Sequence, residues 1–584
     1  MEEELAGRNY LVTTPIQETW PTNGKIIFLG EWCKIYNRRD DLKNLNHTTL
    51  PYHWDNRIKF NNDFNSLNNL YESVLVSLSL TLNKIHKVEF STKYWRILVG
   101  PWLGTFIQVL FDRWEMIEVA LNSQTELYSI IIDIEEHNTV PNDMNEFLKC
   151  ITADNWNHYI YTLILKEMNE IELLKVQYNL INKAKKTKIN LFKYFYKLTA
   201  KTLTPSNSPF VLSSYLSKKN EFKFSLKNKY IPLWYNLTKP NEYNFSLKKR
   251  NFTIKHKAKN EFESFLLKAI PFQIPKIYLE GYMGLKKEVE NLGWQKSPKF
   301  IFTSNSFWED DLFKSYAAYQ NSIGKPLFIA QHGGNYGIVK QSFSENHQLS
   351  ISDRFFSWGW TGRNKKIIPL GNIKTTKPLG INHYKSKKIL LVTCSLPRYF
   401  YFLFNGVLAS QWLDYFDDQC QFINTLNHKT KKNTTVRLYS NDYDWNQKQR
   451  WKDKFEFLDY DNANEPIIKQ LKKTRIFVAT YNATTFLESL SMNIPTVIFW
   501  NPNYWELRED SIPFFKELER VKIFHKNPKS AAKHINLIYD ELETWWNSDD
   551  LQRVKALFLH SYSRNEDKLI NKLDKAIQNF NKTV

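Results

Sequence analysis

Cysteine is scarce in this sequence. Four cysteines, Cys33, Cys150, Cys394 and Cys420, lie far apart among 584 residues, and no two form a CxxC pair. A disulfide framework or a structural zinc site needs cysteines at paired, recognisable spacings, so both are disfavoured. The pattern fits a protein of a reducing compartment.

Long apolar runs and targeting signals are also missing. The N-terminus, MEEELAGRNY, is acidic and lacks the apolar stretch of a secretory signal. The most apolar segment, at 95–111, contains Arg96 and is shorter than the roughly 20 residues that span a bilayer. We therefore expect this segment to be buried in a soluble lobe of a cytoplasmic protein.

Several catalytic signatures do not occur. The sequence has no HExxH, no GxSxG and no P-loop motif, which argues against the enzyme classes that carry them. DYD triplets occur at Asp442–Asp444 and Asp459–Asp461. Such triplets bind Mn²⁺ or Mg²⁺ in single-sheet transferases, but the alternation described below predicts another architecture. We interpret both triplets as incidental and expect neither a metal nor another cofactor.

Positive charge is the strongest compositional feature. Lys and Arg number 80 against 60 Asp and Glu, a formal net charge of +20, which attracts phosphates on nucleotides, nucleic acids or anionic lipids. The densest block, 183–201, interleaves lysines with aromatic residues. Such a block can adsorb peripherally to the inner face of an anionic plasma membrane or stack on bases. A compositional bias toward Lys and Asn is the alternative explanation.

Short apolar runs alternate with helical periodicity in the C-terminal half. Strand patterns occur at 298–304, 325–331, 386–395, 434–440, 475–482 and 494–500, and helix patterns at 310–324, 465–474 and 483–493. This alternation predicts βαβ units and parallel sheets, whose ligands lie at the carboxyl ends of the strands.

We therefore predict an α/β protein with two Rossmann-like lobes and a cleft between them. The first lobe spans 1–380, is opened by a strand at 25–33, and carries a Lys- and Asn-rich, helical insertion at about 180–270. The second lobe spans 386–545. A helical tail at 546–584 crosses back to the first lobe.

A glycine-rich turn, QHGGNYG at 331–337, follows one predicted strand. Gly333 and Gly334 allow the backbone to approach a phosphate or carboxylate closely, and Tyr336 belongs to the same turn. His332 could act as a base or bind an anion. A tight turn with a packed histidine is the alternative.

Polar residues open the helix that follows another predicted strand, in TYNATTFLESLSMNIPTV at 480–497. Amides at a helix start, together with the side chains of Asn482, Thr484 and Thr485, make an anion site. Glu488 lies one turn along and could accept hydrogen bonds from ribose hydroxyls. Ordinary N-capping, with Glu488 as the capping partner, is the alternative.

Two further clusters are candidates. Glu345, His347, Asp353 and Arg354 crowd together at 345–360, where a carboxylate beside a histidine suits proton transfer; a surface salt-bridge set is the alternative. The aromatic segment 91–103 favours packing over a role in binding an acceptor sugar.

The sequence resembles a known family, the LIC-type transferases of O-antigen and related surface-polysaccharide gene clusters. The resemblance covers nearly the whole chain. It is carried by YLVTTPIQETW (10–20), FLGEWC (28–33), YWRILVGPWL (94–103), IAQHGGNYG (329–337), DRFFSWGW (353–360), VRLYSNDY (436–443) and TTFLESLSMNIPT (484–496).

More distantly, the second lobe is similar to GT-B enzymes that use CMP-activated acidic sugars (nonulosonic acids or Kdo) and to CDP-glycerol phosphotransferases. In those enzymes a hydroxyl pair at a helix start holds the donor phosphate. The resemblance therefore places this role on Thr484 and Thr485, and a ribose contact on Glu488.

Together these observations predict a metal-independent GT-B glycosyltransferase of O-antigen or lipopolysaccharide biosynthesis. Its partners would be a nucleotide-activated sugar and a glycan or lipid-linked glycan acceptor. We expect the donor to be bound by Gly333, Gly334, Tyr336, Arg437, Asn482, Thr484, Thr485 and Glu488. The candidate bases are, in order of preference, Glu345, His332, His347 and Glu31.

Two other functions stay open at this point. A CDP-glycerol-type phosphotransferase would use the same donor site. A basic nucleic-acid-binding protein would explain the charge, but the sequence has no RRM, KH or helix-turn-helix pattern, so we expect no nucleic-acid partner.

Overall fold

The computed structural model describes residues 8–123, 126–176, 205–232, 239–374, 378 and 383–583. The basic block at 183–201 lies outside the described residues. The chain forms two compact units. The first comprises Met1–Ser213, Asn228–Leu327 and Arg398–Leu403, and the second comprises Ser214–Lys227, Phe328–Pro397 and Phe404–Val584.

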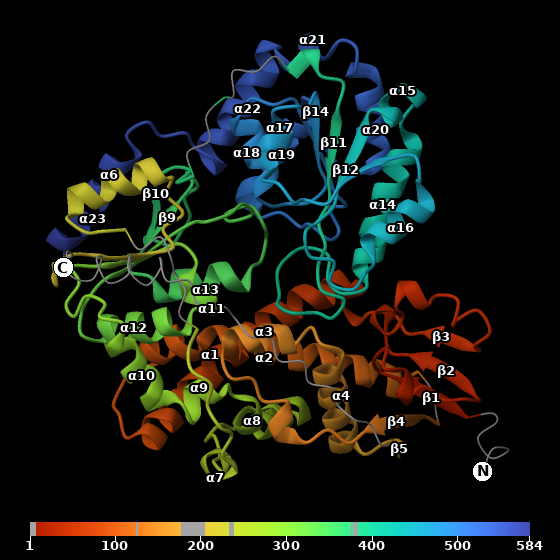
Figure 1. Ribbon diagram of the computed structural model, residues 1–584, viewed down its shortest axis with the longest axis vertical. Coiled ribbons are helices and arrows are strands. Elements are labelled where there is room, and N and C mark those ends of the chain that lie inside the picture. Colours follow the sequence, from red (N-terminus) through yellow and green to blue (C-terminus); the bar gives the residue numbers. More distant parts are fainter. Residues whose placement is uncertain are drawn as a thin grey trace. The chain divides into compact units, whose positions relative to one another are not determined.

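A five-stranded parallel sheet lies near the N-terminus, in the first unit (Figure 1). Its strands follow the order β3 (His47–Thr49), β2 (Lys25–Phe28), β1 (Asn9–Val12), β4 (Tyr128–Ile132) and β5 (Glu172–Val176). All neighbouring strands are parallel. From β1 the chain first adds β2 and β3 on one side, and then crosses over to add β4 and β5 on the other side. Such a reversal opens a ligand crevice beyond the carboxyl ends of the strands.

The strand expected at 25–33, as the opening strand of the first lobe, is the second strand of the β1–β5 sheet, after β1. It exists as β2 and pairs in parallel with β1 and β3. The strand at 298–304, β7 (Ile301–Thr303), pairs instead with β6 (Phe210–Leu212). β6 is buried and lies within the segment expected to be an insertion, so the described part of that segment contributes to a sheet.

Two helices of 30 residues each, α1 (Arg57–His86) and α2 (Thr92–Leu121), pack together in the first unit. The segment predicted to be buried lies within α2, which also contacts α4 (Asp154–Met168) and α12 (Asp311–Ser322). Trp102 is fully buried and Arg96 forms two hydrogen bonds to Glu72. The prediction of a buried segment is confirmed. In the described part of the chain, no helix has the length and apolarity needed to cross a bilayer.

The first unit contains further short helices. They are η1 (Gln17–Thr19), η2 (Glu31–Cys33), η3 (Tyr36–Arg38), η4 (His53–Asp55), η5 (Glu136–Asn138), α3 (Met144–Cys150), α7 (Leu247–Arg250), α8 (Glu261–Gln273), α9 (Lys276–Leu279), α10 (Tyr282–Asn291) and α11 (Ser306–Glu309).

The second unit contains a six-stranded parallel sheet with the same reversal of strand order. Its strands are, in spatial order, β13 (Asp459–Asp461), β12 (Thr434–Arg437), β11 (Ile389–Val392), β14 (Ile476–Ala479), β15 (Thr496–Phe499) and β16 (Phe524–His525). The reversal point lies between β11 and β14. The parallel strands β8 (Leu327–Ala330), β9 (Arg354–Ser357) and β10 (Ile367–Pro369) precede this sheet in the chain.

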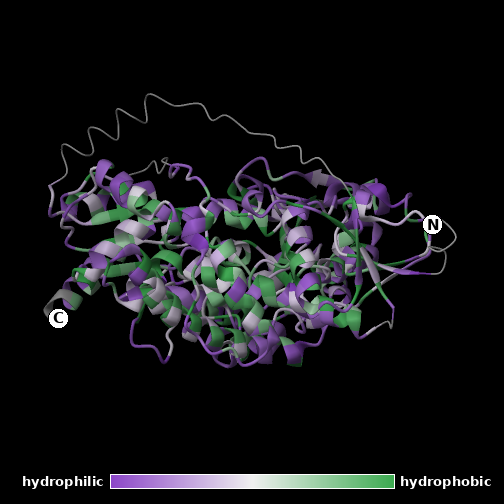
Figure 2. Cartoon of the chain, turned by 90° about the horizontal axis from the view of Figure 1, so that it is seen from below, coloured by the Kyte–Doolittle hydropathy of each residue, from purple (hydrophilic) through white to green (hydrophobic). Residues whose placement is uncertain are grey.

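Helices connect the strands of the second unit. They are α6 (Lys218–Asn228), α13 (Phe343–Ile351), η6 (His383–Lys385), α14 (Gln411–Thr425), α15 (His428–Lys432), α16 (Gln447–Lys454), α17 (Ile467–Leu471), α18 (Thr484–Ser491), η7 (Glu509–Ser511), α19 (Ile512–Arg520), α20 (Pro528–Ile538), α21 (Leu542–Trp546), α22 (Asp549–Tyr562) and α23 (Leu569–Thr583). Hydrophobic and hydrophilic residues mix along the helices (Figure 2), as expected of helices that bury one face.

The six strands and three helices predicted in the C-terminal half are all present, and the expectation of an α/β protein with parallel sheets is confirmed. Strands such as Leu327–Ala330 and Ile389–Val392 are buried along their whole length, as parallel strands with two covered faces should be. The helical tail contacts residues 328–372: the amide of Arg564 donates to the Trp358 carbonyl at 2.8 Å, and Phe580 packs on Phe328.

Arg250 is a fully buried charge in the first unit. Its guanidinium forms two hydrogen bonds of 2.7 Å to the Glu280 carboxylate. It also donates to the carbonyl oxygens of Pro271 and Ile274, each at 2.9 Å. The pair joins α7 to the chain around α8 and α9, and removing one partner would leave an uncompensated charge in the interior.

We expect Glu280→Ala to destabilise the first unit by about 3–5 kcal/mol, because Arg250 would stay buried without its counterion. Thermal unfolding of the full chain measures this change. The matched control is Glu167→Ala, which breaks the exposed pair between Lys268 and Glu167; it should cost no more than about 1 kcal/mol. Equal melting temperatures for the two variants would contradict the assignment.

Candidate functional site

The glycine-rich turn follows β8, and Gln331 fixes its shape. The buried side chain of Gln331 donates to the Gly333 carbonyl at 2.8 Å. Its oxygen accepts hydrogen bonds from the Trp358 amide at 2.9 Å and from the Trp360 indole at 2.8 Å. Sequence reasoning did not single out Gln331, although it begins the quoted motif. The turn is therefore a defined structure anchored to the segment after β9.

The two glycines of this turn lie directly against the start of α18. The amide of Gly334 donates to the Thr484 hydroxyl at 2.8 Å. A Cβ atom at Gly334 would lie 2.2 Å from the Ala483 carbonyl oxygen and 2.7 Å from the Thr484 nitrogen. A Cβ at Gly333 would lie 3.1 Å from the Thr484 hydroxyl. At Gly334 only glycine permits this approach, so the structure brings together the two motifs that the sequence analysis singled out.

The first turn of α18 has no side-chain cap. Its N-cap residue is Ala483, which has no hydrogen-bonding side chain. The alternative of ordinary N-capping by Thr or Asn with Glu488 was therefore wrong, because neither Thr nor Asn occupies the N-cap position. The amides at this helix start are left to bind another acceptor, and helix starts favour anions.

Asn482 adds a buried polar group to the same place. Its side chain is 2% exposed, and neither its amide nitrogen nor its oxygen has a hydrogen-bond partner among the described residues. Buried polar groups are almost always hydrogen-bonded, so an amide in this state indicates a position for a ligand or water. The nearby Thr485 hydroxyl is buried beside Tyr481. Burial raises the pKa of the Tyr481 phenol, and the Thr485 hydroxyl partly lowers it.

Glu488 and Lys374 form a pair of opposite charges near the start of α18. The Lys374 ammonium lies 3.5 Å from the Glu488 carboxylate and also over the rings of Tyr215 and Trp358. Burial raises the pKa of Glu488, and Lys374 offsets part of this rise. Lys374 was not predicted, because the lysine-rich composition gave no reason to choose it.

Glu345 lies on α13 with 3% of its surface exposed. One carboxylate oxygen accepts from the Gly337 amide at 3.0 Å, and the other accepts from Arg508 at 2.5 Å. One oxygen therefore holds the end of the glycine-rich turn, and the other is held by Arg508. His347, on the same helix, is also buried. Arg508 could not be paired with Glu345 from sequence, since the two are 163 residues apart.

His332 is half-buried and precedes Gly333 in the turn. Its ring lies 5.7 Å from the ring of Tyr215 and 5.5 Å from that of Tyr336, edge to face in both cases. Tyr336 is buried, and its hydroxyl accepts from Gln348 at 2.8 Å. Tyr336 thus supports the histidine ring.

Two predicted site residues have other partners. Arg437, at the end of β12, donates to Asp461 at 2.5 Å and to the Glu465 carbonyl at 2.7 Å. Glu31 lies in the first unit, in η2, and pairs with Lys34 at 2.6 Å. The contacts of Arg437 thus lie around β13 and the segment after it, and the Glu31 pair lies within the first unit.

The two DYD triplets have structural partners. Asp461 binds Arg437, and the Asp442 carboxylate accepts from the amides of Asn446 and Gln447, each at 2.7 Å. Within the described ranges, no three His, Cys, Asp or Glu side chains are grouped as metal ligands would be.

A cavity of about 400 Å³ opens beyond the carboxyl ends of β12 and β13. Its lining includes Tyr439, Asp442, Gln447 and Lys448. Strands in a sheet are spaced by about 4.8 Å, and only β11 separates β12 from β14, so this cavity begins about 10 Å from the strand that leads into α18. This distance suits a ligand with a phosphate at one end and an aromatic base at the other.

Comparisons with known proteins assign the chain to a family. Residues 9–577 match the family described as LIC12162 family transferase. No curated protein matches the chain. Among solved structures, it is similar to MurG from Acinetobacter baumannii, with 10% identity, a TM-score of 0.30, and coverage of 66% of this chain and 96% of that one.

Two other solved structures are similar at the same level. A variant of the wall teichoic acid polymerase TagF has 9% identity and a TM-score of 0.29, covering 67% of this chain and 93% of that one. A mutant O-GlcNAc transferase from Thermobaculum terrenum has 8% identity and a TM-score of 0.32, covering 88% and 97%. Because these TM-scores are low, the assignment depends on the family match alone. That match extends over nearly the whole sequence, and the chain therefore belongs to the LIC12162 family of transferases.

Proposed function

We propose that this transferase is a GT-B-type glycosyltransferase that binds the phosphate of a nucleotide-activated sugar at the start of α18. The observation that carries the proposal is the approach of Gly334 to an uncapped helix start beside the unpartnered Asn482 amide. Uncapped amides and a buried amide donor suit a phosphate oxygen. The Lys374 ammonium supplies positive charge nearby.

The rest of a nucleotide fits the surroundings of the helix start. Glu488 can accept hydrogen bonds from ribose hydroxyls. In the cavity beyond β12, the exposed ring of Tyr439 could stack on the nucleobase. The distant resemblance favours cytidine, with a CMP-linked nonulosonic acid or Kdo as the donor. The acceptor would be a surface-polysaccharide or O-antigen glycan, free or lipid-linked, bound by the N-terminal part of the chain.

Transfer needs a base and a stabilised leaving group. A base removes the proton of the acceptor hydroxyl as its oxygen attacks the anomeric carbon. His332 is half-buried and adjacent to Gly333, so its position supports this role best. The contacts of Glu345 with Arg508 and Gly337 support a positioning role. The α18 amides and Lys374 stabilise the negative charge that develops on the departing phosphate.

A CDP-glycerol-type phosphotransferase is the second candidate, because the same helix start would bind its donor phosphate. Product analysis distinguishes the two candidates. A glycosyltransferase leaves a new glycosidic bond and a free nucleotide phosphate, whereas the phosphotransferase leaves a phosphodiester in the product.

We expect Gly334→Ala to abolish nucleotide binding, since its Cβ would displace the turn from the Ala483 carbonyl. The matched control is Gly362→Ala, whose Cβ would meet the end of a flexible Ile367 side chain at 3.1 Å and the Trp360 ring at an ordinary contact distance of 3.8 Å. Asn482→Ala removes the buried amide without a clash and should weaken binding by about 1–3 kcal/mol. Calorimetric titration with CMP, CDP, UDP, GDP and TDP measures these affinities. Wild-type affinity in both site variants would contradict the proposal.

Transfer should persist in EDTA, because the proposed scheme uses helix amides and Lys374 where other transferases use a metal ion. The measurement is the initial rate with the preferred donor before and after chelation. A loss of activity that Mn²⁺ or Mg²⁺ restores would overturn this expectation and would return the two DYD triplets to consideration.

A further inference from the structure

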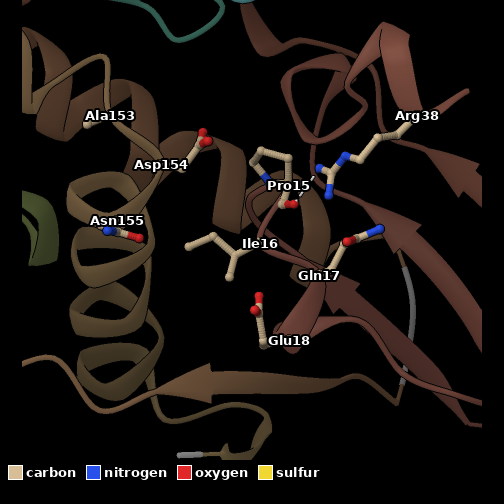
Figure 3. Close-up of a pocket in the computed structure, with 8 residues that line it drawn as sticks. All are labelled: Pro15, Ile16, Gln17, Glu18, Arg38, Ala153, Asp154 and Asn155. Atoms are coloured by element: carbon tan, nitrogen blue, oxygen red, sulfur yellow. Dashed lines mark hydrogen bonds between the residues drawn. The ribbon is translucent and has the colours of Figure 1, made fainter. Parts of the chain in front are cut away.

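A second cavity, of about 470 Å³, lies in the first unit, within the usual range of ligand pockets of about 300–1,000 Å³. It is lined by the turn that follows β1, by Arg38 of η3, and by the start of α4 (Figure 3). These segments follow β1, β2 and β4 in the chain. All three connections leave the carboxyl ends of adjacent parallel strands, at the point where the strand order reverses. This is where doubly wound sheets bind ligands.

The polar groups of this cavity carry both signs of charge. Glu18 and Asp154 contribute carboxylates, Arg38 contributes a guanidinium, and Gln17 and Asn155 contribute amides. Carboxylates and amide oxygens accept hydrogen bonds, whereas the guanidinium and amide nitrogens donate. In a chain with a net charge of +20, this lining has one more carboxylate than cation. The two carboxylates disfavour a phosphate, and the mixture suits neighbouring hydroxyls that each donate and accept.

Two of these groups are held in place by buried partners. Asp154 accepts from Arg398 at 3.1 Å and from the Tyr399 hydroxyl at 2.8 Å, while 32% of its side chain stays exposed. Arg398 is 3% exposed and also donates to the Trp32 carbonyl. Arg38 donates to the Pro15 carbonyl at 2.7 Å. Fixed polar groups lose little entropy on binding, which favours recognition of a small polar ligand.

The segment directly after β1 contains another polar group that supports a binding role. The Thr14 hydroxyl is fully buried, has no hydrogen-bond partner among the described residues, and precedes Pro15 of the cavity wall. In addition, Ala153 gives the start of α4 no side-chain cap, so its first amides are available as donors.

We propose that this cavity binds a neutral sugar through its vicinal hydroxyls. The site is argued from its own lining and its place in the sheet. Only the identification of this sugar with the acceptor glycan rests on the proposed function.

The test is saturation-transfer NMR on the full chain. The neutral probes are methyl α-glucoside, methyl α-galactoside and N-acetylglucosamine, and the anionic probes are glucuronic acid and glucose 1-phosphate. At least one neutral sugar should bind, and more tightly than either anion. The double variant Glu18→Ala/Asn155→Ala removes two exposed side chains of the lining and should weaken binding about tenfold or more, the equivalent of one good hydrogen bond.

The matched control is Glu135→Ala/Asn145→Ala. Both residues are exposed and lie outside the cavity lining, and Asn145 is the second residue of α3 as Asn155 is of α4. This control should bind the sugar like wild type. No binding of any neutral sugar, a preference for the anions, or equal loss in both double variants would overturn the proposal. Nucleotide titration of the same proteins tests the two sites separately. If the wild-type protein binds a neutral sugar but no nucleotide, the donor proposal is contradicted and the sugar-site proposal is not.

Discussion

The contact between Gly334 and the start of α18 is the constraint on which the candidate donor site depends. A methyl group at this position would overlap the Ala483 carbonyl. This close approach lets the Thr484 hydroxyl accept from the Gly334 amide, while Ala483, at the N-cap of α18, has no side chain that could cap the helix. Within the described part of the chain, the helix start has no side-chain cap and the Asn482 amide has no hydrogen-bond partner. Other residues stabilise this contact indirectly. Gln331 holds the first end of the turn, Glu345 holds the last end, and Arg508 binds Glu345.

The same topological rule accounts for both proposed sites. The β1–β5 sheet and the β11–β16 sheet reverse their strand order beside their first strand, β1 in one and β11 in the other. In each sheet, the segments that carry polar groups leave the carboxyl ends next to that reversal. The two sites differ in charge: the α18 site combines uncapped helix amides with one Lys374–Glu488 pair, whereas the β1 cavity has two carboxylates and one guanidinium. A phosphate suits the first and a neutral sugar suits the second.

Part of this arrangement could be predicted from sequence. The C-terminal strands are continuous apolar runs between helical patterns, so their positions and the α/β class followed directly. The glycine turn and the polar start of α18 were found because each combines unusual residues at the end of a strand. Of the N-terminal sheet, only β2 was predicted. Its strands are as short as those of the C-terminal half, but two 30-residue helices separate β3 from β4, so the regular alternation that reveals βαβ units is missing there.

Pairings over long sequence separations could not be predicted. Glu345 was expected to be a base beside a histidine, but its carboxylate binds Arg508, which comes 163 residues later. Arg437 was expected at the donor, but Asp461 on the next strand engages its guanidinium. In both cases the residue type suited catalysis, and only tertiary contacts reveal the competing partner.

Hydrogen exchange tests the central claim most directly, since it reports on individual segments of the bound protein. On addition of the nucleotide that binds best, the amides of the first turn of α18 and of the turn at 331–337 should exchange more slowly. Peptides from α20, which packs on α14, β15 and β16 of the same unit, should exchange at an unchanged rate. Protection confined to other segments, with none at the start of α18, would contradict the assignment of the donor phosphate to this helix.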